Sequence, residues 1–145
     1  MIKQVISWFE KHNIISLILT ILIAIFIFYM SSLTFEVGSP GPEFPFKSIA
    51  YHFLIFALFS GFLLIILVKG KKPNLFILAI ILSLIYGISD EFHQLFVPGR
   101  FFAISDILTD SAGILFAGFI YVLTFPRKEL QAPREAKNIK KTVYS

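Results

Sequence analysis

The sequence of 145 residues contains no cysteine and few charged residues. Because cysteine is missing, disulfides, cysteine-ligated metal sites and palmitoylation are excluded, and the redox compartment is left undetermined. Charged side chains make up 15% of the chain, whereas 57% of the residues are hydrophobic and 17% are aromatic, and the mean hydropathy is +0.81. Soluble globular domains do not have this composition. We therefore expect a protein that crosses a lipid bilayer.

Four apolar segments are each long enough to cross the hydrocarbon core as a helix, which takes about 20 residues. These segments cover residues 14–32, 48–68, 74–96 and 104–125. The first segment is longer than the apolar part of a usual signal peptide and lacks a clear small-residue cleavage site, so we expect a membrane span. The sequence therefore predicts an all-α membrane protein with four transmembrane helices.

The basic residues are distributed unevenly among the connections. The N-terminal segment holds two of the 13 Lys and Arg residues, the second connection three and the C-terminal segment six. The positive-inside rule then places both termini in the cytoplasm, which agrees with an even number of spans. Membrane orientation explains the net charge of +4, so no nucleic-acid partner is expected. We expect one domain over residues 1–125 and a basic, disordered cytoplasmic tail over residues 126–145.

Polar and ionisable residues gather at the predicted outer ends of the last three spans. They are Lys47, His52, Asp90, Glu91, His93, Gln94, Arg100, Ser105, Asp106 and Asp110. After Asp110 only 16 uncharged residues precede Arg127, and as a helix they cover about 24 Å of a hydrocarbon core about 30 Å thick. Asp90, Glu91 and Asp110 are therefore expected below the outer interface, where unpaired charges cost several kcal/mol. We expect them to face one another or a water-filled cavity.

Helical spacing indicates which of these residues share a face. The third span places three polar side chains on one face, namely Asp90, His93 and Gln94. On the fourth span Asp106 and Asp110 are four residues apart, and Gly113 continues the same stripe with a small residue that lets another helix approach closely. A salt-bridge network without a ligand is the alternative, in which Arg100 and Lys47 neutralise carboxylates. Two cations cannot neutralise all four carboxylates, which weighs against a salt-bridge network as the whole explanation.

The polar segment also resembles a known family. Residues 89–100 contain Asp-Glu-x-His-Gln followed by Pro-Gly-Arg, and Asp106-x-x-x-Asp110 with Gly113 comes next. This pattern resembles the VanZ-like family, and Lys47 with His52 resembles the lysine and histidine that open its second helix. The resemblance covers the second to fourth spans. It implies a multi-pass protein of the bacterial plasma membrane with a role at the cell envelope, and the founding member is associated with teicoplanin resistance.

Two hypotheses follow, and the sequence leaves both open. In the first, an outward-opening cavity binds the polar or anionic headgroup of an envelope lipid or a lipid-linked cell-wall precursor. The binding residues would be Arg100, Gln94, Asp110, Lys47 and His52. Considered without the other polar residues, His52 is expected to be a hydrogen-bonded packing residue.

A small ion-coupled transporter is a third possibility beside these two hypotheses.

In the second hypothesis, the protein is an intramembrane enzyme acting on the same class of substrate. His93 would be the general acid or base, oriented by Asp90 or Glu91, with Asp106 as a further catalytic carboxylate. Arg100 would stabilise developing negative charge. A metal ligated by His93 or His52 with Asp106 and Asp110 ranks lower, because no HxxxH or HExxH spacing occurs. We expect no metal and no cofactor, and the oligomeric state is left open.

Overall fold

The computed structural model describes residues 1–34, 45–69 and 72–124, and these ranges contain five helices and no strand. The helices are α1 (Ile2–Lys11), α2 (Asn13–Ser31), α3 (Pro45–Val68), α4 (Leu75–Gln94) and α5 (Ile104–Thr124). Helices α2 to α5 are each long and apolar enough to cross a membrane. The predicted all-α fold with four spans is therefore confirmed. Most of the first connection and the basic tail lie outside the described residues.

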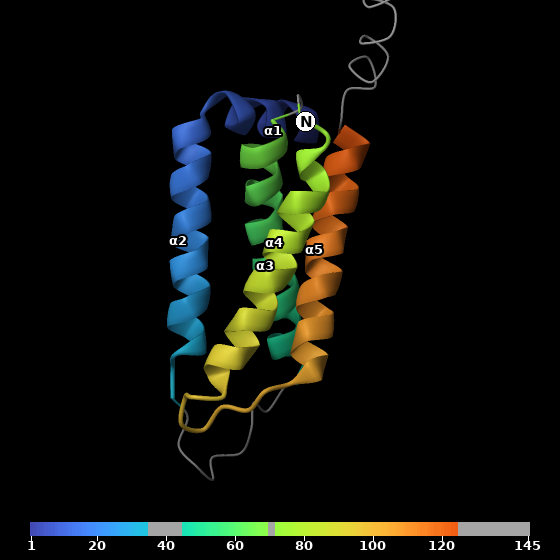
Figure 1. Ribbon diagram of the computed structural model, residues 1–145. Coiled ribbons are helices and arrows are strands. Elements are labelled where there is room, and N and C mark those ends of the chain that lie inside the picture. The colour runs from blue at the N-terminus through green and yellow to red at the C-terminus, as the bar shows by residue number, and fades with distance from the viewer. Residues whose placement is uncertain (35–44, 70–71, 125–145) are drawn as a thin grey trace, which may run out of the picture.

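The four long helices run side by side, and helices consecutive in the chain run in opposite directions (Figure 1). As a result, the N-terminus and the end of α5 lie at one end of the bundle. The connection between α4 and α5, residues 95–103, lies at the other end with the first turns of α3. The cytoplasmic location of both termini remains a prediction from the charge distribution.

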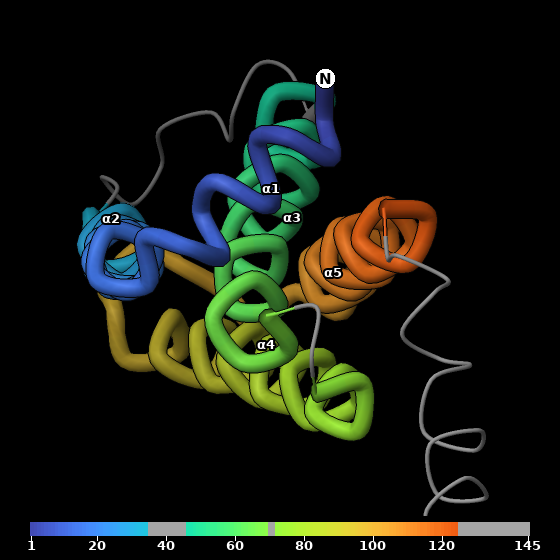
Figure 2. The backbone as a smooth tube through the Cα atoms, turned by 90° about the horizontal axis from the view of Figure 1, so that it is seen from above, coloured from blue at the N-terminus to red at the C-terminus, as the bar shows by residue number. Residues whose placement is uncertain are grey.

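Helix α1 was not predicted, and it lies across the N-terminal end of the bundle instead of extending α2 (Figures 1 and 2). Ile6 and Phe9 pack against the apolar core, and the Phe9 ring meets the Phe62 ring of α3 edge-on at a centroid distance of 5.1 Å. The Tyr121 hydroxyl of α5 donates a hydrogen bond of 2.8 Å to Glu10. An amphipathic helix of this kind suits the membrane interface.

Helix α3 is the central element, with α2, α4 and α5 packed around it (Figure 2). One buried apolar cluster contains Leu64, Ile65, Val68, Ala79 and Tyr121, and a second contains Ile27, Phe56, Phe59 and Ile114. Helices α3 and α5 approach each other closely at Gly113, where an added Cβ would lie 2.3 Å from the carbonyl oxygen of Phe53. Lipid tails are as apolar as the side chains, so the hydrophobic effect does not drive helices together in a membrane. Close van der Waals contact of this kind stabilises their association instead.

A hydrogen bond between α2 and α4 gives a first testable prediction. The Tyr86 hydroxyl donates to the Ala24 carbonyl at 2.7 Å. Replacing Tyr86 with phenylalanine should lower the free energy of unfolding by about 1 kcal/mol, the usual net value of such a bond. The measurement is chemical unfolding in mixed micelles. Tyr29→Phe is the control, because the Tyr29 side chain is 60% exposed; equal losses in both variants would contradict the prediction.

Candidate functional site

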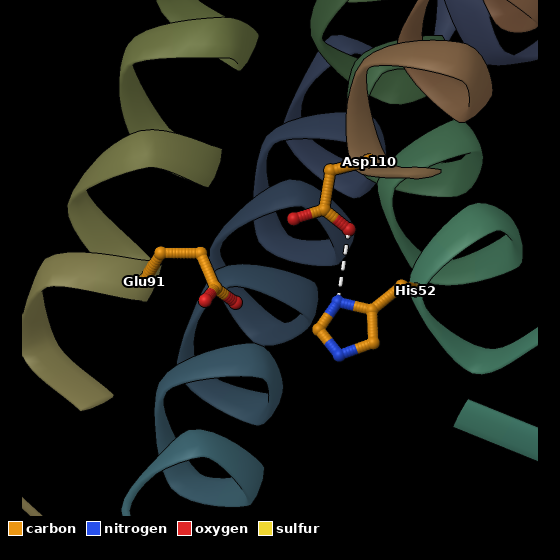
Figure 3. A group of neighbouring side chains, drawn as sticks. All are labelled: His52, Glu91 and Asp110. Atoms are coloured by element: carbon orange, nitrogen blue, oxygen red, sulfur yellow. Dashed lines mark hydrogen bonds and ion pairs between the residues drawn. The ribbon is translucent and has the colours of Figure 1, made fainter. Parts of the chain in front are cut away.

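Three ionisable side chains from three helices meet inside the bundle, at the end opposite the N-terminus. They are His52 of α3, Glu91 of α4 and Asp110 of α5, and one ligating atom from each lies within 4.8 Å of the other two (Figure 3). Their exposed fractions are 6%, 0% and 1%. We call these three residues the three-helix cluster. Ionisable groups buried this fully need partners, because an isolated buried charge is strongly destabilising.

His52 lies between the two aspartates of α5. Its Nδ1 is 3.0 Å from Asp110 Oδ1, and its Nε2 is 3.6 Å from Asp106 Oδ2. An ionised carboxylate only accepts hydrogen bonds, so with Asp110 ionised the hydrogen lies on His52 Nδ1, which donates it to Asp110. The spacing of four residues brings Asp106 and Asp110 to the same face of α5. A histidine held by a carboxylate in this way has a fixed tautomer and ring orientation.

Glu91 is held by a second set of hydrogen bonds. Its Oε1 accepts from Gln94 Nε2 at 3.1 Å, and its Oε2 accepts from the backbone N–H of Ala103 at 3.0 Å. Gln94 Nε2 also donates to Asp90 Oδ2 at 3.2 Å, and the Ser31 hydroxyl donates to the same oxygen at 2.7 Å. This network ties the end of α2, the end of α4 and the loop before α5 into one unit.

Arg100 holds the end of α2. Its Nη2 donates to the Met30 carbonyl at 2.6 Å and its Nε to the Leu33 carbonyl at 3.2 Å. A cation is favourable at a helix C-terminus, where carbonyl groups lack partners in the helix. Burial lowers the pKa of the Arg100 guanidinium, and the negative charge of Asp90 opposes this effect. Arginine stays protonated in proteins. The preceding Gly99 has a φ of 80°, which a glycine adopts without strain in the predicted turn.

His93 points away from the three-helix cluster. Its Nε2 is 3.0 Å from the Ser32 hydroxyl, and its ring stacks on Phe28 of α2 at a centroid distance of 4.5 Å. Two residues along a helix correspond to a rotation of about 200°. Glu91 and His93 therefore face opposite sides of α4, and the histidine in the cluster is His52. Lys47 lies exposed in the first turn of α3.

The structure adds residues that the sequence did not indicate. Ser31 is the closest partner of Asp90, and the Ala103 N–H holds Glu91. Three buried side-chain oxygens have no hydrogen-bond partner among the described residues, namely Tyr51 Oη, Ser60 Oγ and Asp110 Oδ2. The side chains of the three-helix cluster lie close to one another. The outward-opening cavity that the sequence suggested stays a prediction.

These features define a four-span helical membrane protein with buried ionisable residues at one end of the bundle. Residues 16–125 match the family model of VanZ/LLP1, and this range includes most of the first span, the other three spans and every residue of the polar end. The chain therefore belongs to the VanZ/LLP1 family, in agreement with the resemblance of its motifs. No curated protein and no solved structure matches the chain.

Proposed function

We propose that the protein binds the polar or anionic headgroup of a lipid-linked cell-wall precursor at the polar end of the bundle, in the bacterial plasma membrane. Binding there would shield the precursor and contribute to resistance against glycopeptides of the teicoplanin type. The observation that carries the proposal is the three-helix cluster, in which fully buried ionisable groups come from three different helices. Ionisable residues at membrane depth are expensive and usually serve a function.

The chemistry of the polar end suits such a headgroup. The carboxylates of Glu91, Asp106 and Asp110 accept hydrogen bonds from sugar hydroxyls and peptide amides. Arg100 and Lys47 would supply positive charge that attracts phosphate. The family membership supports a role at the cell envelope.

An intramembrane enzyme acting on the same precursor is the second candidate. It is favoured by the 3.0 Å contact between His52 Nδ1 and Asp110, because a carboxylate that orients a histidine is a common arrangement for a general base. His52 is better placed for this role than His93, which contacts Ser32 and Phe28.

A reconstitution experiment tests both candidates. Wild-type protein in nanodiscs is incubated with a pyrophosphate-linked wall precursor, and binding and product formation are measured together. Glu91→Gln and Asp110→Asn should each weaken binding by at least about 10-fold, the cost of a lost charged hydrogen bond. Glu10→Gln is the matched control, because Glu10 lies at the other end of the bundle and contacts Tyr121.

The outcomes separate the candidates. Binding without product supports the binding protein, and slow product formation that Asp110→Asn abolishes supports the enzyme. Cells that depend on the protein for growth on teicoplanin should become sensitive when they carry Glu91→Gln but not Glu10→Gln. The proposed function would be refuted if the wild type bound no precursor and cells with Glu91→Gln were no more sensitive to teicoplanin than wild-type cells.

A further inference from the structure

We propose that the three-helix cluster is a metal site, in which His52, Glu91 and Asp110 bind one divalent transition-metal ion, with Zn²⁺ the best match. One imidazole and two carboxylates are a ligand set that Zn²⁺ accepts, and three protein ligands leave a fourth position for water or substrate. The imidazole argues against Mg²⁺ and Ca²⁺, which prefer oxygen ligands. The expectation of no metal rested on the missing HxxxH or HExxH spacing and on carboxylates that lie on separate helices. The structure brings ligands from three helices together.

The distances fit this assignment. The three ligating atoms lie within 4.8 Å of one another. Ligand atoms on a tetrahedral Zn²⁺ stand about 3.3 Å apart, given bonds of about 2.0 to 2.1 Å. Small side-chain rotations are therefore enough to close the site, and the helix backbones need not move. Figure 3 shows that the three side chains converge on one space from α3, α4 and α5.

A buried oxygen without a hydrogen-bond partner supports the metal site independently of the distances between the ligand atoms. Asp110 Oδ2 is buried and has no hydrogen-bond partner among the described residues, while Oδ1 is bonded to His52. In Figure 3 the oxygen that is not bonded to His52 lies on the side of Asp110 that faces Glu91. A buried carboxylate oxygen without a partner costs free energy. A cation between Asp110 and Glu91 would provide that partner.

The charges of the three-helix cluster and the hydrogen bonds around it also agree with a bound divalent metal ion. With both carboxyl groups ionised beside a neutral imidazole, the site would carry two negative charges, which one divalent cation balances. Gln94 and the Ala103 N–H hold the Glu91 oxygens, and each oxygen keeps a second lone pair for a metal. Such outer hydrogen bonds are typical of metal ligands. If Nδ1 of His52 is the ligating nitrogen, its proton leaves to solvent when the metal binds.

The test uses the full chain in detergent with an affinity tag that contains no histidine. The protein is stripped with a chelator, exposed to Zn²⁺, washed, and analysed for bound zinc. We expect one Zn²⁺ per wild-type chain. His52→Asn, Glu91→Gln and Asp110→Asn should each weaken Zn²⁺ binding by more than about 100-fold, since loss of an outer-shell partner alone costs 10- to 100-fold. His12→Asn is the matched control, because His12 is exposed at the other end of the bundle.

X-ray absorption of the bound zinc gives a readout that does not depend on the variants folding. One imidazole with oxygen ligands supports the site, whereas two imidazoles or none overturns it. The proposal also fails if the wild type retains no zinc, or if folded variants bind it as tightly as the wild type. Bound zinc is measured without any lipid precursor, so this result stays separate from the proposed headgroup binding.

Discussion

Replacing Gly113 with alanine should destabilise the bundle by about 3 kcal/mol, the upper part of the range for overpacking a tight contact. The added Cβ would lie 2.3 Å from the Phe53 carbonyl oxygen and 3.2 Å from the Ala57 nitrogen. Both atoms belong to the backbone of α3, so no side-chain rotation relieves the clash. The two helices must separate, and Asp110 lies on α5 one turn before the clash. The three-helix cluster should therefore lose its geometry as well.

Gly61 provides the matched control for this substitution. It lies in α3, and an added Cβ there would meet nothing within 4 Å. Gly61→Ala should be neutral or stabilise the protein by up to about 1 kcal/mol, because alanine favours the helix. Unfolding in mixed micelles measures both variants, and precursor or Zn²⁺ binding measures the cluster. The prediction is contradicted if Gly113→Ala and Gly61→Ala have the same free energy of unfolding and the same affinity for precursor or Zn²⁺. The close approach of α3 and α5 would then not be what maintains the geometry of the site.

The four spans could be predicted because the bilayer fixes the length of an apolar helix. Helix α1 shows the limit of that reasoning. Its apolar residues Ile2, Ile6 and Phe9 have helical spacing, but they are too few for a span, and the chain continues through His12 into α2. The placement of α1 involves contacts with residues far away in the chain, such as the hydrogen bond from the Tyr121 hydroxyl to Glu10 at 2.8 Å.

The polar end could be predicted as a set of residues, while its internal pairing could not. Spacing along α4 relates Asp90, His93 and Gln94 to one another, but it does not say which side of α4 faces α3 and which faces α2. The rotation of α4 puts Glu91 beside His52 and puts His93 beside Ser32. His52 and its partner Asp110 are 58 residues apart on different helices. No short-range pattern links residues so far apart in the chain.

His52 and Asp110 should show strong energetic coupling in a double-mutant cycle. His52→Leu leaves the Asp110 carboxylate without its histidine in a buried site, and Asp110→Ala leaves His52 without its 3.0 Å partner. Breaking a buried pair by removing one member costs about 3 to 5 kcal/mol. Removing both members leaves no unpaired group at this contact, so the double variant should be more stable than the sum of the single losses predicts, by about 2 kcal/mol.

The cycle is measured by unfolding in mixed micelles with a chelator present, so that bound metal does not contribute. Glu10→Gln combined with Asp110→Ala is the control pair, since these residues lie at opposite ends of the bundle and their effects should add within about 0.5 kcal/mol. Additive losses for His52 and Asp110 would mean that their contact contributes no net stability. With coupling present, the double variant should fold and yet bind neither Zn²⁺ nor the wall precursor. That combination would show that the fold tolerates the loss of the pair, whereas binding requires it.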